Sequence, residues 1–526
     1  MQITVSDNSF ILSFPYDHAT VEMVKAMPDG RRYMPADKTW KAPITLDNCQ
    51  YLIDHGHDTA IVRDALDRIN APRVAPDMDC IDWGAVTPFN HQRIGTSHLL
   101  QHDAWALFFE QGCGKTLCAV KMLEKTGIRA LIVCPKTVMR SWQNEFAKYS
   151  TIVPVLVEGS AAKRGAALRS AHVAIVNYDV LAKHIDDINF DCVIYDESQF
   201  LKSGKAQRTK AAGAIAAKAS KRYLLTGTPI ANNAADIFSQ YKILDSQIFG
   251  TSFYSFRSKY FENRGRYFPD WQIKAGSIEA IKEKIQMRSY RVLKADVLDL
   301  PEKLYQTQYI EMQPEQRRIY KQLEKELIAE IGDVTISINY LLPKLMKLNQ
   351  VASGFIIDTN GGGQTVEIEH DKLHTLRQII DDYSGAVVVF CLFRHDIDAI
   401  LSIYPDAVHI DGAVSADQRQ IAIDMIETGV KRLIVLQEQA GSVGITLVKP
   451  HLCIFYSHSY SLLNRLQAED RLHRIGQRNA VTYIDLIASG TIEEDIMQAI
   501  ACKRSLAADV QGDSLAGDII LRLKKC

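Results

Sequence analysis

The sequence predicts an α/β protein with two lobes, each built on a parallel β-sheet, and a small α+β domain before them. Two series of short, uninterrupted apolar segments carry this prediction, one within residues 85–295 and one within residues 376–526. Such segments are typical of strands covered by helices on both faces of a parallel sheet, whereas half-exposed strands alternate apolar and polar residues. At 526 residues the chain has room for about three to four domains of ordinary size.

The composition excludes several classes of protein. Hydrophobic residues make up 47% and charged residues 23% of the chain, as in ordinary globular proteins and unlike disordered ones. The 61 basic and 62 acidic residues leave a net charge of −1, so binding to nucleic acid needs a local basic groove. The longest apolar run, at residues 386–393, has about eight residues, and a bilayer-spanning helix needs ~20. We therefore expect no membrane partner.

The ten cysteines are scattered, and none forms a C-x-x-C pair. This pattern favours free thiols in a reducing compartment and argues against a zinc site. The first residues, MQITVSDNSF, lack the basic and then apolar pattern of a signal peptide. We expect a cytoplasmic, monomeric protein, associated with the nucleoid or in the host cytoplasm if the gene is bacterial or phage-encoded.

Residues 1–75 form the predicted α+β domain. Short alternating runs at residues 3–5 and 10–14 predict strands, residues 19–26 predict a helix, and a further run surrounds Trp40. Two prolines in residues 71–76 disfavour helix on either side and indicate a linker.

The strands of the two lobes follow in order along the chain. The first lobe, residues 85–295, has a helical and aromatic extension from about residue 250, and residues 296–375 are expected to form a helical linker or insertion. The second lobe covers residues 376–526. The expected strands are at residues 105–109, 130–134, 173–176 and 192–195 in the first lobe, and at 386–393, 407–410, 432–436, 452–456 and 482–487 in the second.

A glycine-rich segment at residues 112–116, GCGKT, follows the apolar run at residues 105–109. Glycines let backbone N–H groups wrap a phosphate, and the amino end of the following helix adds partial positive charge. Lys115 would neutralise the β- and γ-phosphates, and the hydroxyl of Thr116 would bind Mg²⁺. Because Phe109 stands where the full G-x-x-x-x-G-K-T pattern has its first glycine, an ordinary glycine turn is the alternative.

An acidic pair ends the strand at residues 192–195, in the sequence DESQ at residues 196–199. A carboxylate at a strand tip can hold Mg²⁺, which assigns this role to Asp196. The adjacent carboxylate of Glu197 can polarise an attacking water while the metal offsets developing charge. The alternative is an exposed acidic pair where a strand meets a loop.

A second charged string, QAEDRLHRIGQ, occupies residues 467–477. Arg471 and Arg474 are three residues apart, so they share a face if the segment is a helix. Arginine from a facing lobe can stabilise charge on a phosphoryl group in transfer. Taken alone, such a pair is more often part of a solvated helix surface.

Together these segments resemble the superfamily-two helicase motor, in its Swi/Snf-type branch of double-stranded DNA translocases. The resemblance covers residues 85 to 505, and the R-I-G-Q ending of the last string is the most specific to the branch. It implies two RecA-like lobes in tandem, a DNA-dependent ATPase activity, and ATP and Mg²⁺ as cofactors. The matching strings are TPFNHQ at 87–92, GCGKT at 112–116, LIVCPK at 131–136, DESQ at 196–199, LLTGTP at 224–229, VVVF at 387–390, AGSVG at 440–444 and residues 467–477.

The resemblance also implies a role for each matching residue. At the nucleotide site it assigns adenine recognition to Gln92, phosphate binding to Gly112, Gly114 and Lys115, Mg²⁺ binding to Thr116 and Asp196, and activation of water to Glu197. Arg471 and Arg474, beside Gln467, would act as arginine fingers, and Gly444 would lie in the nucleotide-site loop that couples both lobes to DNA. Thr226 and Thr228 would relay the nucleotide state, and Lys136, Asn177 and Lys202 would contact the DNA backbone.

The chain departs from the family pattern at one position of the acidic motif. Gln199 stands where the branch usually has His, which affects the expected coupling to Gln467 and leaves both carboxylates intact.

The N-terminal domain carries a separate resemblance. Residues 14–40 resemble the HepA-related (HARP) module of annealing helicases, which binds DNA and directs the motor to forked substrates. The alternative is a small packing domain in which Tyr33 and Trp40 belong to the core.

A run of basic residues follows the acidic motif. Residues 202–222 carry seven lysines and arginines and no acidic residue, and Arg208 and Lys210 are the further candidates for contact with DNA. Phosphate contacts are independent of base sequence and suit a motor that walks over any duplex. We predict an ATP-dependent translocase on duplex or forked DNA, which could remodel forks, migrate branches, anneal strands or displace bound protein. An RNA-dependent helicase ATPase and a non-hydrolysing, ATP-controlled DNA scaffold are the alternatives.

Overall fold

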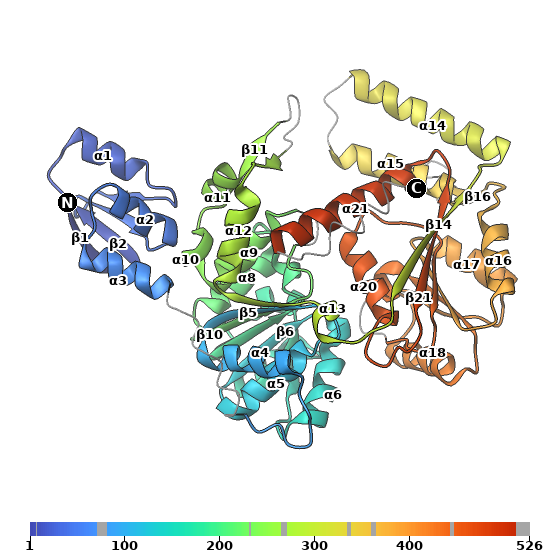
Figure 1. Ribbon diagram of the computed structural model, residues 1–526, viewed down its shortest axis with the longest axis horizontal. Helices are drawn as coiled ribbons and strands as arrows, with labels where there is room; N and C mark the ends of the chain where they lie inside the picture. The colour runs from blue at the N-terminus through green and yellow to red at the C-terminus, as the bar shows by residue number, and fades with distance from the viewer. Residues whose placement is uncertain are drawn as a thin grey trace. The chain divides into compact units, whose positions relative to one another are not determined.

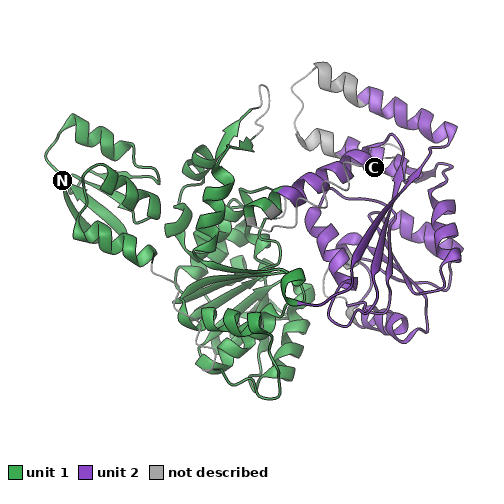
Figure 2. Ribbon diagram, viewed as in Figure 1, with its two compact units in different colours: residues 1–297, 506–519 green, residues 298–505, 520–526 purple. Residues whose placement is uncertain are grey.

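The computed structural model describes residues 1–6, 8–70, 81–230, 233–264, 271–333, 338–358, 364–441 and 446–511. Figure 1 shows the elements in chain order, and Figure 2 shows the division into two compact units. The first unit comprises residues 1–297 and 506–519, and the second comprises residues 298–505 and 520–526. Among the described residues, no helix is both long and apolar enough to cross a membrane.

An antiparallel four-stranded sheet in the order β1-β2-β4-β3 forms the N-terminal domain. Phe10 and Leu12 of β2 are fully buried, and the side chains of Asp17, Thr45 and Thr59 cap the first turns of the three helices. Its elements are β1 (Gln2–Ser6), β2 (Ser9–Ser13), α1 (His18–Lys25), β3 (Arg32–Met34), β4 (Thr39–Pro43), α2 (Leu46–Asp54) and α3 (Ala60–Ile69).

Tyr33 and Trp40 face each other across β3 and β4, with ring centroids 5.2 Å apart. The side chain of Tyr33 is 45% exposed, and Trp40 is only half-buried. The interpretation of both rings as core residues is therefore wrong for Tyr33, because this edge of the sheet lies open to solvent.

The first lobe is built on a seven-stranded sheet in the order β13-β5-β10-β9-β6-β8-β7. Every pair of neighbouring strands is parallel, so all the carboxyl ends lie along one edge. Its elements are α4 (Asn90–Gln101), β5 (Ala104–Phe109), α5 (Lys115–Thr126), β6 (Ala130–Cys134), α6 (Met139–Tyr149), β7 (Val155–Leu156), α7 (Ala161–Ser170), β8 (Val173–Asn177), η2 (Tyr178–Lys183), β9 (Cys192–Asp196), η3 (Ser198–Leu201), α8 (Gln207–Ala216), β10 (Lys221–Leu225) and β13 (Ser289–Val292).

The aromatic extension packs largely on itself. Phe249, Phe256 and Tyr260 are buried and contact one another edge to face or tilted. Tyr254, on the same helix as Phe256 and Tyr260, is instead 71% exposed. The extension contains α9 (Asp236–Leu244), α10 (Ser246–Phe249), α11 (Phe253–Tyr260), β11 (Phe261–Asn263), β12 (Trp271–Ile273), α12 (Ser277–Gln286) and α13 (Lys294–Val297).

The second unit contains a six-stranded parallel sheet in the order β14-β21-β20-β17-β19-β18. The stretch expected as a helical linker, residues 296–375, contributes the edge strand β14 (Lys303–Ile310) and the hairpin of β15 (Phe355–Asp358) and β16 (Gln364–Glu367) as well as helices α14 (Pro314–Asp333) and α15 (Ile338–Ala352). The other elements are α16 (Lys372–Asp382), β17 (Val387–Cys391), α17 (Arg394–Ile403), β18 (Val408–Ile410), α18 (Ala416–Thr428), β19 (Leu433–Gln437), α19 (Glu438–Gly441), β20 (Leu452–Phe455), α20 (Leu462–Leu472), β21 (Val481–Ala488) and α21 (Ile492–Gln511).

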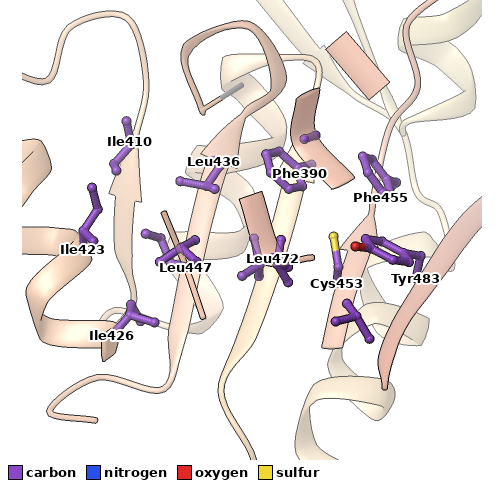
Figure 3. Packing of buried hydrophobic residues seen from close by; sticks show 14 of the residues in the cluster. Phe390, Ile410, Ile423, Ile426, Leu436, Leu447, Cys453, Phe455, Leu472 and Tyr483 are labelled. Atoms are coloured by element: carbon purple, nitrogen blue, oxygen red, sulfur yellow. The ribbon is translucent and has the colours of Figure 1, made fainter. Parts of the chain in front are cut away.

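Both faces of this second sheet are covered, as the uninterrupted apolar strands predict. Figure 3 shows one face, where Phe390, Leu436 and Cys453 of the central strands meet Leu472 of α20. The opposite face packs through Val389 and its neighbours on the other side of the pleat. This packing fixes α20, the helix that carries the string at residues 467–477.

Candidate active site

The glycine-rich loop joins β5 to α5 at the carboxyl edge of the first sheet. Gly112 and Gly114 both have left-handed backbone conformations, with φ of 86° and 84°, which residues other than glycine rarely adopt. A Cβ atom on Gly114 would also clash with the side-chain amide of Gln92. The loop thus needs glycine for two reasons, and it leads into the amino end of α5, where Lys115 and Thr116 occupy the first turn.

Lys115 folds back over the loop. Its ammonium group donates to the carbonyl oxygens of Phe109 at 2.7 Å and Glu110 at 3.3 Å. These carbonyls hold the lysine beside the loop, in reach of a group bound there. This is the arrangement expected of a lysine that exchanges carbonyl partners for phosphate oxygens.

Gln92 braces the same loop from α4. Its amide oxygen accepts from the Phe89 N–H at 3.0 Å, and its amide nitrogen donates to the Cys113 carbonyl at 3.3 Å. His91 contacts the same carbonyl through Nε2 at 2.8 Å. The structure therefore places Gln92 against the phosphate loop, and its role in adenine recognition stays a prediction.

The acidic pair lies two strands away, at the end of β9. Asp196 Oδ1 accepts from the Glu197 N–H at 3.0 Å, and Asp196 Oδ2 accepts from the Trp142 indole at 2.7 Å. Glu197 has φ of 52°, a left-handed conformation that is uncommon for a residue with a Cβ and that clusters at functional sites. This turn separates the two carboxylates, so that Asp196 stays buried while Glu197 is only partly covered.

Gln199 links the acidic pair to the end of the neighbouring strand β10. Its amide nitrogen donates to Glu197 Oε2 at 2.7 Å, and its amide oxygen accepts from the Thr226 hydroxyl at 2.6 Å. The Thr226 hydroxyl in turn accepts from the Thr228 N–H at 3.0 Å. Glutamine in place of histidine thus makes a continuous chain of hydrogen bonds from Glu197 to the Thr226–Thr228 turn.

Burial raises the pKa of Asp196 to about 6, and the adjacent charge of Glu197 adds to the rise. The Trp142 indole and the positive charge of Lys115 act in the opposite direction. Two neighbouring carboxylates with one partly buried lysine nearby leave an excess of negative charge that a cation would offset. Asp196 and the hydroxyl of Thr116 are oxygen donors of the kind that Mg²⁺ prefers, so the donor set fits this metal.

The arginine string lies in the second unit. Arg471 is buried on α20 and its Nε donates to the Gln467 carbonyl at 3.0 Å. Arg474 donates to the hydroxyl of Thr446. The expectation that both arginines share one helix face is wrong, because α20 ends at Leu472 and Arg474 follows in a turn that leads to Gly476, with φ of 103°. Their convergence on the phosphate loop stays a prediction, and Gly444 lies outside the described residues.

Three candidate DNA contacts follow neighbouring strands at the carboxyl edge of the first sheet. Lys136 follows β6, Asn177 ends β8, and Lys202 follows η3 after β9. Lys136 is exposed, and Lys210 on α8 is exposed as well. The guanidinium of Arg208 lies 5.7 Å from the Phe200 ring centre. The sheet topology therefore brings residues that are far apart in the sequence to one edge.

Sequence reasoning missed the residues that support the acidic pair. Trp142 binds the Asp196 carboxylate, and the Tyr178 hydroxyl donates to the Asp196 carbonyl at 2.7 Å. Ser198 donates to Gln240 at 2.7 Å, and Gln240 donates to the Pro229 carbonyl at 2.6 Å. No local pattern marks Trp142, Tyr178 or Gln240, because each comes from a segment other than the acidic motif.

Comparison with known protein families agrees with this geometry. The SNF2-related domain family matches residues 91–355, half of the chain, and the helicase conserved C-terminal domain family matches residues 371–476. The chain belongs to the SNF2-related family. As a member it is a DNA-dependent ATPase, and its two parallel-sheet lobes are the RecA-like pair of the helicase motor.

Relatives of this SNF2-family chain differ in size. A SWI/SNF-related matrix-associated actin-dependent regulator of chromatin subfamily A-like protein 1 homolog of Caenorhabditis elegans is 26% identical over 98% of the chain and 76% of its own length. The TATA-binding protein-associated factor mot1 of Schizosaccharomyces pombe is 25% identical over 78% of the chain, which spans only 25% of that protein. A solved structure, the Sulfolobus solfataricus SWI2/SNF2 ATPase core in complex with dsDNA, is 24% identical over 86% of this chain and 97% of that one, with a TM-score of 0.40.

Proposed function

We propose that this SNF2-family ATPase is a translocase that hydrolyses ATP to move along duplex or forked DNA without regard to base sequence. One observation carries the proposal: the glycine-rich loop, the acidic pair and three of the candidate backbone contacts (Lys136, Asn177 and Lys202) follow strands at the carboxyl edge of one parallel sheet. Ligands of open α/β sheets bind at this edge. We therefore propose that the residues that hydrolyse ATP and the residues that contact the DNA backbone are positioned by the same β-sheet.

Each residue at this edge has a defined task in the proposal. Lys115 leaves the Phe109 and Glu110 carbonyls and binds phosphate oxygens, while Glu197, held by Gln199, orients the attacking water. Mg²⁺, held by Thr116 and Asp196, supplies charge neutralisation at the phosphates when it is bound. Thr226 relays the state of Glu197 toward the DNA side. Arg471 and Arg474 act from the second lobe.

The ATPase measurement tests the proposal directly. Hydrolysis is followed without nucleic acid, and then with single-stranded DNA, linear duplex, forked DNA and duplex RNA, with Glu197→Gln as the blank. We expect strong stimulation by duplex or forked DNA and loss of that stimulation in Lys115→Ala. Stimulation by RNA alone would favour an RNA helicase, and ATP-dependent DNA binding at background turnover would favour a scaffold.

A matched pair of charge variants tests the proposed DNA edge. Lys136→Ala with Lys210→Ala removes two exposed lysines, one directly after β6 at the carboxyl edge and one near the start of α8. Lys125→Ala removes an exposed lysine from the last turn of α5, which runs away from that edge. Each lost phosphate contact lowers the slope of log affinity against log salt by roughly 0.9, so we expect a smaller slope only in the double variant. Equal slopes in both would contradict the assignment.

We also propose that the N-terminal domain directs the motor to forks. The alignment with the C. elegans relative covers 98% of the chain and so includes this domain, and Tyr33 and Trp40 present an open aromatic pair. Stacking on an unpaired base is worth about 1–3 kcal/mol. We expect Tyr33→Ala to weaken stimulation by forked DNA relative to duplex, and Tyr254→Ala, which removes a 71% exposed ring outside this domain, to leave that ratio unchanged.

A further inference from the structure

A buried tryptophan contacts the acidic pair of the ATPase site directly. Trp142 lies on α6, and its side chain has no exposed surface. Its indole Nε1–H donates to Asp196 Oδ2 at 2.7 Å. Because β6, which precedes α6, is a neighbour of β9 in the sheet, the fold brings a helix 54 residues earlier in the chain onto the end of the acidic strand.

The indole completes a set of donors that fixes the orientation of Asp196. Oδ1 accepts from the Glu197 N–H at 3.0 Å, and the main-chain carbonyl accepts from the Tyr178 hydroxyl at 2.7 Å. The indole holds the second carboxylate oxygen, so neither oxygen is left to rotate. Since the Glu197 N–H donates to Asp196 Oδ1, the orientation of the Asp196 carboxylate also stabilises the left-handed backbone conformation of Glu197.

The chemistry of indole suits this task. Indole N–H is a donor only, so Trp142 cannot ligate a metal or take up a proton. Each carboxylate oxygen has two acceptor directions, and one donor on Oδ2 leaves the other direction open for a cation. Without the indole, the carboxylate would be free to turn toward the ammonium of Lys115, whose charge already acts on it.

We propose that Trp142 is a positioning residue of the ATPase site, which holds the carboxylate of Asp196 in the orientation that receives Mg²⁺. The proposal rests on the proposed role of Asp196 as a ligand of Mg²⁺. Donors that orient a metal-binding carboxylate typically contribute 10- to 100-fold to metal affinity or activity. Trp142 thereby links the α6 segment to nucleotide binding.

The test compares two tryptophan-to-phenylalanine variants of the full chain. Trp142→Phe keeps an aromatic ring and removes the indole N–H. Trp105→Phe removes an equally buried indole near the amino end of β5, away from the glycine-rich loop that follows this strand. The Trp105 ring stacks on His98 and His102, with ring centroids 4.7 and 4.2 Å apart. The readout is binding of a fluorescent, non-hydrolysable ATP analogue, titrated with Mg²⁺ and repeated in EDTA.

We expect Trp142→Phe to raise the half-saturating Mg²⁺ concentration by about 10-fold or more, with affinity in EDTA unchanged. Trp105→Phe is expected to match the wild type in both conditions. An equal Mg²⁺ requirement in the two variants would overturn the proposal, and so would an equal loss of affinity with and without Mg²⁺, since that loss reports a general packing defect.

A second measurement uses only the wild-type chain, so it does not depend on whether Trp142→Phe folds. Five indole resonances are expected from a ¹⁵N-tryptophan-labelled wild-type chain, and the Trp142 signal should shift when Mg²⁺ is added to the nucleotide complex. An absence of any Mg²⁺-dependent indole shift would refute the proposal. Because neither measurement uses DNA, a chain that shows these Mg²⁺ effects without DNA-stimulated hydrolysis would disprove the translocase and leave the role of Trp142 intact.

Discussion

Replacing Gln199 by methionine tests the hydrogen-bonded link between the acidic pair and the neighbouring strand. Methionine has nearly the same length and removes both the donor to Glu197 Oε2 at 2.7 Å and the acceptor for Thr226 at 2.6 Å. A hydrogen bond to a charged group contributes about 1.5–3 kcal/mol. If Glu197 needs that bond to orient water, kcat should fall by about 10- to 150-fold, since each 1.36 kcal/mol corresponds to a factor of ten.

The assay is steady-state hydrolysis with saturating duplex DNA, with kcat and KM separated. Thr226→Val loses two neutral hydrogen bonds, one to the Gln199 amide oxygen and one from the Thr228 N–H, each worth about 0.5–1.5 kcal/mol. It keeps the bond from Gln199 to Glu197, so its kcat should fall less. The double variant should be scarcely worse than Gln199→Met alone, because the two residues act through one chain of hydrogen bonds.

Gln316→Met is the control for loss of a buried amide. Gln316 is 2% exposed on α14 and donates to the Val351 carbonyl at 2.8 Å, so its replacement should lower the unfolding temperature without a specific loss of kcat. A Gln199→Met protein with the kcat of the wild type would refute the reasoning, and so would fully additive losses in the double variant.

Three further predictions concern the loop and the buried charges. Gly114→Ala should abolish ATP binding, measured by calorimetry, because its Cβ would clash with the side-chain amide of Gln92 and its φ of 84° disfavours alanine. Gly127→Ala, at a φ of 58° with open space around it, should cost only about 1–2 kcal/mol of stability. Burial raises the pKa of Asp396 to about 7, so the folded state binds more protons than the unfolded state and stability should fall as pH rises from about 4 to 7. Asp396→Asn should flatten that part of the stability curve in denaturant titrations across pH. Lys372→Met should destabilise the second unit by about 3–5 kcal/mol in urea unfolding, because it leaves the fully buried carboxylate of Glu493 without its ion-pair partner. Lys321→Met, which breaks an exposed ion pair, should show no comparable loss of stability.

Much of the fold follows from local patterns. The apolar segments at residues 130–134 and 192–195 form β6 and β9 within one residue of their predicted ends, because a strand buried on both faces needs a continuous apolar run. The glycine-rich turn into α5 was also predictable, since its glycines serve a backbone geometry that is set within five consecutive residues.

Two local predictions failed for tertiary reasons. Arg474 was expected on a helix, but the chain leaves α20 after Leu472, which packs into the sheet core. The stretch at residues 296–375 was expected to be helical, but residues 303–310 pair along the whole of β21 as an edge strand. Edge pairing depends on a partner far along the chain, which local pattern does not specify.

The sequence by itself determined the apolar strands of the two parallel-sheet lobes, the glycine-rich loop and the acidic pair at a strand end, because each of these depends on neighbouring residues in one segment. Only the tertiary structure decided what holds the acidic pair in place. Trp142, Gln199 and Thr226 come from three segments, and they meet because strands β6, β9 and β10 lie side by side with their carboxyl ends at one edge. Strand order follows from the packing of helices over the whole sheet, and that long-range packing is the physical reason why the supporting contacts could not be derived from the sequence.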